Sequence, residues 1–410
     1  MSNAIKTISF GQIAEFRNGL NYGKESQGKG CLIIGVSNFN DRFTPDYKSL
    51  DEINPEGIVK EEDYLQKGDI VFVRSNGNKK LVGSSLYIDG DVKALFSGFC
   101  IRAKISADFI DNAFCAYFTK SAMFKSQISS FASTNINNLN QGTLSRVKIP
   151  LFTKKDQQKI AAVLSTLDAK IDCNNRINAE LEAMAKTLYD YWFVQFNFPD
   201  HNGQPYKSSG GKMVYNPTLK REIPAGWMDK QLSQIANITM GQSPLGESLN
   251  GSGDGVVFYQ GSTDFGWQFP TVRLYTTRGT RMAKCNDILL SVRAPVGDIN
   301  IAYKDCCIGR GLAALNSKEG FDGFLFYVMK YFKTVFDRRN SEGTTFGSIT
   351  KDDLHSLPLA YPTNILLKEY DKVVSQYNKM VFVRSMENQH LTQLRDWLLP
   401  MLMNGQVTVV

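Results

Sequence analysis

Metal-ligating and redox residues are scarce in this sequence. Its 410 residues include 3 histidines and 7 cysteines, and no two cysteines form a Cys-x-x-Cys pair. An odd number of cysteines without such a pair argues against a zinc site and against a disulfide framework, so we expect reduced, mostly buried thiols and no bound metal. The histidines, His201, His355 and His390, have no serine, cysteine or metal-ligating neighbour at a recognisable spacing. The sequence therefore argues against catalysis by histidine.

Long hydrophobic runs are also lacking. No apolar run approaches the ~20 residues that a membrane-spanning helix needs, and the first residues lack the basic-then-apolar order of a signal peptide. We therefore expect a cytoplasmic protein. Hydrophobic residues make up 42% of the chain and charged residues 21%, which permits a buried core and excludes wholesale disorder. The net charge of +7 mildly favours a polyanionic partner.

Nucleotide-binding and methyl-transfer motifs are missing. The segment Gly23–Lys29 resembles a phosphate loop, but Gly30 stands where the Mg²⁺-binding serine or threonine belongs. The apolar run Cys31–Val36 that follows predicts a strand, whereas a phosphate loop opens a helix. Asn216-Pro217 lacks the second proline and the aromatic residue that base-methylating enzymes use. We interpret the chain as a binding protein without a cofactor of its own.

What the sequence does contain is an internal repeat. Three segments of the first half have echoes in the second: Ser9–Phe16 at Gln231–Ile238, Lys67–Ser75 at Cys285–Arg293, and Arg146–Leu151 at Leu354–Leu359. Each match alone is weak, but the three occur in the same order in both halves. We therefore predict two copies of one module. The alternative is two unrelated domains whose strands match by coincidence.

Each half ends in a long segment of helical periodicity. Apolar residues recur three, four or seven positions apart, Met184 among them, and the two segments keep a constant offset. The residues expected to pair the helices are Ile160, Leu167, Asn174, Leu181 and Leu188 in the first and Tyr370, Tyr377, Arg384, Leu391 and Leu398 in the second. We interpret the polar Asn174 and Arg384 as residues that set the register.

These patterns predict an α+β protein in which modules and long helices alternate. The expected order is a first module at 1–152, a helix at 153–198, a polar, glycine-rich connecting loop at 199–222, a second module at 223–362 and a helix at 363–405. Pro400 and Gly405 should end the last helix. Each module should contain one further helix, around Phe114–Ser126 and Phe321–Arg338.

Two loops of the first module are rich in side chains that bind nucleic acid. Arginine can pair with guanine, asparagine with adenine, and lysine with phosphate. The candidate DNA-binding residues are Arg74, Asn76, Asn78, Lys79, Lys80, Asn135, Asn137 and Asn138. A solvated hairpin tip is the alternative for the first loop, because Asn-Gly is a common tight turn. Helix capping is the alternative for the second.

The loops of the second module have a similar character. The candidates there are Gln242, Ser243, Gln260, Arg293, Arg310 and Thr345. Several stand beside glycines, which would let the backbone approach a phosphate closely. The alternative for Gly241 and Gly311 is that they only turn the chain.

Several of these segments resemble a known family. Leu164–Ile171, Asn178–Met184 and Trp192-Phe193 are similar to the central conserved region of the specificity subunit of type I restriction-modification systems. Leu394–Pro400 with Asn404-Gly405 resembles the distal conserved region of that family, and Ile223–Trp227, Gly241–Pro244 and Ser291–Gly297 resemble its second recognition domain. The resemblance covers nearly the whole chain, but Gly23–Asp63 is not diagnostic.

The resemblance implies a fold and a role. Two target-recognition domains, related by a pseudo-twofold repeat and separated by two antiparallel, coiled-coil-like helices, would each read half of an interrupted site in double-stranded DNA. The chain would be non-catalytic and without a membrane partner. Two modification subunits would carry S-adenosylmethionine, and restriction subunits would use ATP and Mg²⁺. The alternatives are a scaffold whose modules bind protein, and a repeat enzyme with an unrecognised site.

Overall fold

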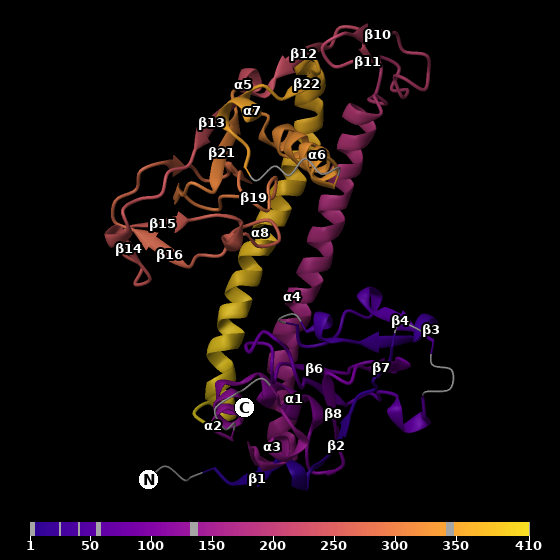
Figure 1. The fold of residues 1–410 in the computed structure, drawn as a ribbon, viewed down its shortest axis with the longest axis vertical. Helices are drawn as coiled ribbons and strands as arrows, with labels where there is room; N and C mark the ends of the chain where they lie inside the picture. The colour runs from indigo at the N-terminus through magenta and orange to yellow at the C-terminus, as the bar shows by residue number, and fades with distance from the viewer. Residues whose placement is uncertain are drawn as a thin grey trace. The chain divides into compact units, whose positions relative to one another are not determined.

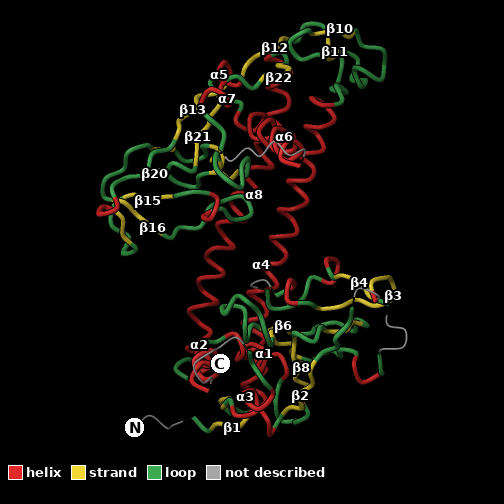
Figure 2. The backbone as a smooth tube through the Cα atoms, in the orientation of Figure 1, coloured by secondary structure: helices red, strands yellow, loops and turns green. Residues whose placement is uncertain are grey.

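The computed structural model describes residues 5–23, 26–39, 42–54, 59–131, 138–341 and 348–409. The chain forms two compact units. The first unit comprises Met1–Cys173 and Glu387–Val410, and the second comprises Asn174–Met386. The long helices α4 (Lys154–Tyr189) and α8 (Asn364–Met403) each contribute one half to each unit (Figure 2).

Within its described residues, the first unit contains three small sheets and, besides the long helices, three short α-helices. Figure 1 labels the three short helices of this unit. Its strands are β1 (Thr7–Ser9), β2 (Ala14–Asn18), β3 (Gln27–Ile34), β4 (Asp51–Ile53), β5 (Ile70–Val73), β6 (Ser85–Tyr87), β7 (Ala94–Phe96), β8 (Cys100–Ile105) and β9 (Lys148–Pro150). Its short helices are α1 (Asn112–Lys120), α2 (Ala122–Phe131) and α3 (Gln141–Arg146). The sheets have the strand orders β1-β9, β2-β8-β5-β6 and β4-β3-β7.

The second unit repeats this plan. Its strands are β10 (Met213–Asn216), β11 (Arg221–Pro224), β12 (Met228–Gln231), β13 (Ala236–Met240), β14 (Leu249–Asn250), β15 (Val256–Tyr259), β16 (Leu274–Thr276), β17 (Met282–Ala283), β18 (Ile288–Ser291), β19 (Ile299–Ile301), β20 (Cys306–Ile308), β21 (Leu312–Ser317) and β22 (Pro358–Tyr361). Its short helices are α5 (Leu232–Ile235), α6 (Asp322–Ser341) and α7 (Lys351–His355). The sheets β12-β22 and β13-β21-β18-β19 match β1-β9 and β2-β8-β5-β6 of the first unit, and in the sheet β14-β16-β15-β20-β17 the strands β16-β15-β20 correspond to β4-β3-β7. The predicted α+β class and internal repeat are confirmed.

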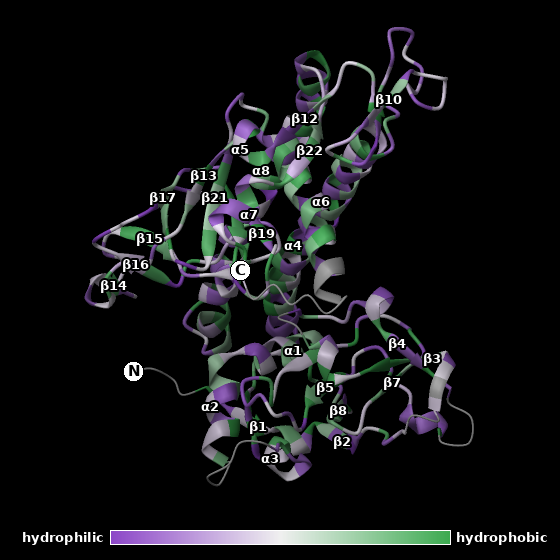
Figure 3. Ribbon diagram, turned by 45° about the horizontal axis from the view of Figure 1, so that its top comes forward, coloured by the Kyte–Doolittle hydropathy of each residue, from purple (hydrophilic) through white to green (hydrophobic). Residues whose placement is uncertain are grey.

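A central strand in each unit separates two layers of core. In β5, Ile70 and Phe72 face the core that includes α1, α2 and the long helices, whereas Val71 and Val73 face the sheet of β3 and β7. The strand β18 divides its residues in the same way. Because both faces are covered, β5 is apolar throughout, and β18 is apolar except for its last residue, Ser291. In the second unit, β21, which pairs with β18, and β15 of the adjoining sheet are coloured green, as hydrophobic strands, in Figure 3.

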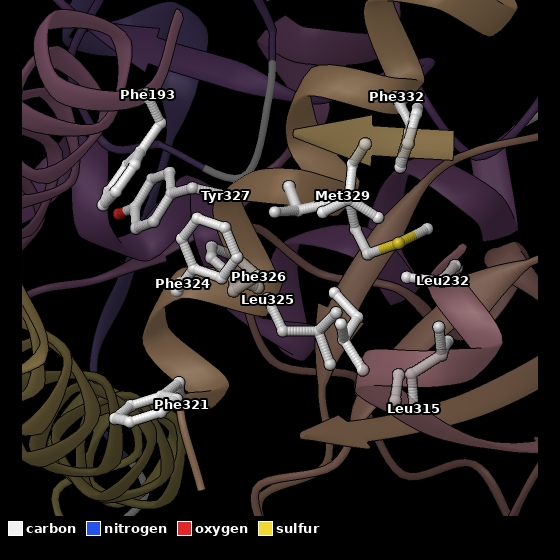
Figure 4. Close-up of a cluster of buried hydrophobic side chains, with 14 of the residues drawn as sticks. Phe193, Leu232, Leu315, Phe321, Phe324, Leu325, Phe326, Tyr327, Met329 and Phe332 are labelled. Carbon is white, nitrogen blue, oxygen red and sulfur yellow. The ribbon is translucent and has the colours of Figure 1, made fainter. Parts of the chain in front are cut away.

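The core of the second unit is rich in aromatic rings (Figure 4). Phe193 follows α4 in a π-helical turn, Asp190–Val194, and its ring centroid lies 4.9 Å from that of Phe324 on α6. Leu232 from α5 and Leu315 from β21 complete the cluster. Offset and edge-to-face aromatic pairs of this kind stabilise a core beyond the area they bury.

The long helices run antiparallel in each unit. In the first unit, Arg395 Nη1 donates to Asp168 Oδ1 at 2.8 Å, and Lys170 Nζ lies 3.5 Å from Glu387 Oε2. From the first pair to the second, the residue number rises on α4 and falls on α8, so the two helices run in opposite directions. In the second unit, Asn178 Nδ2 donates to Ser385 Oγ at 3.3 Å, and the Tyr370 hydroxyl donates to the Ala185 carbonyl at 3.4 Å. The same antiparallel order results.

The residues expected to pair the helices differ in burial. Ile160, Asn174, Leu181 and Tyr370 are buried, whereas Leu167, Leu188, Tyr377, Arg384, Leu391 and Leu398 are half-buried. Arg384 Nη1 donates to the Met380 carbonyl of its own helix at 3.2 Å. Met184 is 52% exposed, and Ala185 is buried instead. A small side chain is needed there because the fully buried Tyr370 lies against it.

Three local expectations were wrong. The helix predicted around Phe114–Ser126 is broken at Ser121, whose extended backbone ends α1 and whose hydroxyl accepts the Phe124 N–H at 3.3 Å. The last helix does not end at Pro400, which lies inside α8; the helix ends at Met403, and only Gly405, with φ +69°, lies at its end as expected. The glycine-rich stretch 199–222 is not only a loop, because it contributes to the hairpin of β10 and β11.

In the described parts of the chain, no helix is long and apolar enough to cross a membrane.

Candidate nucleic-acid interface

Most candidate residues of the second unit gather around one turn, Gly309–Gly311, between β20 and β21. Three backbone hydrogen bonds bring the ends of other strands to this turn: Gln242 N–H to Ile308 O at 3.0 Å, Gly309 N–H to Tyr259 O at 2.8 Å, and Val292 N–H to Gly311 O at 2.9 Å. Gln260 follows Tyr259, and Arg293 follows Val292. We call Gly241–Ser243, Gln260, Arg293 and Gly309–Gly311 the second corner.

The first unit builds the same frame. The matching bonds run from Leu20 N–H to Phe96 O at 2.9 Å, from Ser97 N–H to Ile34 O at 2.9 Å, and from Arg74 N–H to Phe99 O at 2.8 Å. Ser75 pairs with Asn138 in a short bridge, as Arg293 pairs with Ser348 in the second unit. We call Gly19–Tyr22, Arg74, Ser75, Ser97–Phe99 and Asn138 the first corner.

One glycine in each corner permits a close approach of two backbones. A Cβ on Gly19 would lie 2.1 Å from Ser97 O, and a Cβ on Gly241 would lie 2.2 Å from Gly309 O. Neither distance is compatible with a side chain. Gly241 is therefore required by close packing of the strands, in addition to any turn that it makes.

The second corner presents two arginines to solvent. Arg293 and Arg310 are exposed, and neither forms an ion pair within the part of the chain that the structure describes. Ser243 Oγ accepts the Arg310 N–H at 3.4 Å, which ties two candidates together. Arg273 is different, because its guanidinium is held by the buried Asp264 at 2.5 Å. The two exposed guanidinium groups can therefore bind an external acceptor.

The candidates of the first unit divide into two kinds. Asn76 Oδ1 accepts the Asn78 N–H at 2.7 Å, and Asn78 Oδ1 accepts the Lys80 N–H at 3.1 Å, so both amides shape the turn. Lys79 and Lys80 are exposed, Arg74 is half-buried, and none of these three has an ion pair among the described residues. Asn138 is exposed. Asn135, Asn137 and Thr345 lie outside the described residues.

The cysteines beside the corners are buried thiols. All seven cysteines are free. Burial raises the pKa of Cys100 and of Cys306 to about 12, so both stay protonated near neutral pH. Among the residues that are described, no three or more His, Cys, Asp or Glu side chains are placed to hold a metal ion. What the corners offer is hydrogen bonding, positive charge and aromatic surface.

A family model described as "Type I restriction modification DNA specificity domain" matches residues 4–183 and 224–369, which is most of the chain. The chain belongs to this family of type I restriction-modification specificity subunits. Each matched segment contains one corner. The predicted family is confirmed.

Two known relatives match 96% and 66% of the chain. The MjaX type I restriction enzyme specificity subunit of Methanocaldococcus jannaschii is 29% identical over 402 residues, 96% of this chain and 91% of that protein. The MjaIX specificity subunit of the same organism is 25% identical over 285 residues, 66% of this chain and 63% of that protein. A crystal structure of an S subunit from M. genitalium shares the fold, with a TM-score of 0.60 at 15% identity, and the match covers 98% of this chain and 97% of that one.

Sequence reasoning missed several corner residues of the specificity subunit, among them Asn21, Tyr22 and Phe99. Tyr22 is 39% exposed, and burial, with Asp51 and Cys100 nearby, raises its pKa. Phe99 is 61% exposed. Extending the repeat from Ile13 and Ile235 aligns Gly19 with Gly241, and this step would have found Asn21. Phe99 carries no such signal, because an aromatic residue before a strand usually indicates core.

Gly241→Ala tests the corner frame. Because the new Cβ would overlap the Gly309 carbonyl, we expect the free energy of unfolding to fall by about 1–3 kcal/mol. Gly246→Ala is the control, since nothing lies within 4 Å of its Cβ position, and it should change stability by less than about 0.5 kcal/mol. Urea denaturation measures both. Equal stabilities of the two variants would contradict the close approach.

Proposed function

We propose that each unit of this specificity subunit reads one half of an interrupted site in double-stranded DNA through its corner. The observation that carries the proposal is that one backbone frame, with matching hydrogen bonds, presents different side chains in the two units. Gln242, Arg293 and Arg310 in the second corner take the places of Leu20, Ser75 and Gly98 in the first. A shared frame with exchanged side chains suits two different base sequences.

The proposal also assigns the chemistry to other subunits. The chain is a non-catalytic, cytoplasmic subunit that positions two modification subunits, which carry S-adenosylmethionine, and restriction subunits, which use ATP and Mg²⁺. Two further points support this division: the sequence lacks nucleotide-binding and methyl-transfer motifs, and the relatives are named as specificity subunits of restriction enzymes.

Arg293→Ala tests the second corner. If Arg293 reads a base, the complex with modification subunits should lose about 1–3 kcal/mol of discrimination at one position of one half-site. If it contacts a phosphate, binding should weaken evenly, and the slope of log affinity against log salt should shrink by about one. DNA retardation and sequencing of methylated motifs separate these outcomes.

The matched control is Arg278→Ala. Arg278 belongs to the same unit and carries the same charge, but it pairs with Glu247 at 3.4 Å outside the corner. It should leave discrimination unchanged. Arg293→Ala with unaltered binding and methylation would remove Arg293 from the interface. A wild-type complex that shows no sequence-specific, salt-sensitive retardation would overturn the proposed function and favour a scaffold whose modules bind protein.

A further inference from the structure

Phe99 presents an apolar ring to solvent at the tip of the first corner. It is 61% exposed and lies between β7 and β8, next to Gly98. Leaving a phenylalanine side chain in water forgoes a large share of the free energy that its burial would contribute. An exposed phenylalanine on a DNA-reading surface therefore calls for an apolar partner on the DNA.

The backbone under this ring is fixed on several sides. Phe99 O accepts the N–H groups of Arg74 at 2.8 Å and Ser75 at 3.4 Å, and Phe99 N–H donates to Ser97 Oγ at 3.3 Å. Ser97 is 6% exposed. Gly98 N–H donates to Leu20 O at 2.7 Å. The turn that carries the ring is thus hydrogen-bonded to the segments at Leu20, Ile34 and Arg74-Ser75. A specific contact needs a side chain on a rigid backbone of this kind.

The groups around Phe99 are those that read base edges. The Asn21 amide lies against Gly98, close enough that a Cβ there would be 2.0 Å from Asn21 Oδ1. The backbone N–H of Arg74 donates to Phe99 O, so this arginine belongs to a segment bonded to the same turn. In the second corner Gly311 occupies the position of Phe99 and Arg310 that of Gly98. The two units thus exchange a large apolar group for a guanidinium at the same turn.

We propose that Phe99 determines specificity in the first half-site by contacting the 5-methyl group of a thymine in the major groove. This inference rests on the proposed function. The thymine methyl is the apolar group that a base pair presents in the major groove, and phenylalanine is one of the side chains that fit it. At the equivalent turn, the Arg310 guanidinium suits guanine, which presents two acceptors.

The test replaces each thymine of the first half-site by deoxyuridine, which lacks only the methyl group. The recognised sequence is first read from methylated motifs, and affinity is then measured with the full chain in complex with its modification subunits. One replacement should lower wild-type affinity about fourfold, the effect of one buried methyl group. Phe99→Ala should bind thymine and uracil equally at that position, and Phe99→Leu should keep part of the preference.

Phe109→Ala is the matched control, because Phe109 is a 48% exposed phenylalanine in the same unit but outside the corner. It should keep the full preference for thymine. The inference is overturned by a first half-site without thymine, by wild type that ignores every replacement, or by Phe99→Ala that retains the preference. In all three cases sequence-specific binding persists, so the proposed function stands. The proposed function itself would be overturned only if the wild-type complex showed no sequence-specific retardation of DNA.

Discussion

A fragment of residues 1–198 should form a symmetric dimer and direct methylation to a palindromic site built from the first half-site. The first unit needs the last part of α8, since Leu399, Leu402 and Met403 belong to its core. In the fragment, the second half of α4 from another copy can take this place, because the two helices share a constant offset of apolar positions. Isologous pairing of this kind closes a twofold dimer.

The mass of the fragment in light scattering and the methylated motif in cells test this expectation. A fragment with Leu181→Asp and Leu188→Asp is the control, because charges on the pairing face should keep it monomeric. A folded wild-type fragment that stays monomeric would contradict the equivalence of α4 and α8. A dimer that still methylates an asymmetric motif would contradict the assignment of one half-site to each unit.

Arg395→Ala should strongly destabilise the first unit. Arg395 Nη1 donates to Asp168 Oδ1 at 2.8 Å, and the Tyr117 hydroxyl donates to Asp168 Oδ2 at 2.8 Å. The pair is largely buried, with side-chain exposures of 23% for Arg395 and 14% for Asp168. Burial, followed by the Asp168 charge, raises the pKa of Tyr117, so this donor stays protonated. Removing the arginine leaves a poorly solvated carboxylate, and we expect a loss of about 2–4 kcal/mol, allowing for the residual exposure.

Lys170→Ala gives the comparison on the same two helices. Lys170 and Glu387 are 3.5 Å apart, but their side chains are 49% and 43% exposed. Solvent screens such a pair, so the change should cost less than about 1 kcal/mol. Urea denaturation of both variants provides the measurement. Similar losses for the two substitutions would show that burial does not distinguish these ion pairs.

Apolar residues at helical spacing made the long helices predictable. Three weak sequence matches that occur in the same order in both halves made the repeat predictable. Helical spacing cannot choose between adjacent residues when packing demands a small side chain, so Met184 was counted in the apolar pattern although Ala185 is the buried residue. The break at Ser121 depends on a hydroxyl that bonds backbone groups on both sides. The hairpin of β10 (Met-Val-Tyr-Asn) and β11 (Arg-Glu-Ile-Pro) comes from two four-residue strands without an alternating apolar pattern.

The residue types of the candidate site could be predicted from the sequence, but the way in which the fold brings these residues together could not. Arg293, Arg310 and Gln260 attracted attention because their side chains can read bases. Their meeting depends on the parallel pairing of β15 with β20, which joins Tyr259 to Ile308 across a long stretch of chain. No local pattern encodes that pairing. Asn76 and Asn78 illustrate the converse, since their amides fit base recognition by type but are engaged in shaping a turn.

The discontinuous make-up of the first unit has a consequence for synthesis on the ribosome. The second unit, Asn174–Met386, is one continuous stretch and has all its residues before the chain ends. The first unit comprises Met1–Cys173 and Glu387–Val410. Its core is incomplete until the second segment has been synthesised, because that segment contributes Leu399, Leu402 and Met403. The part of the protein made first is therefore completed last. During that interval its unfinished core is exposed to aggregation and to chaperones, and loss of the final residues of the chain would harm the unit at the opposite end of the sequence.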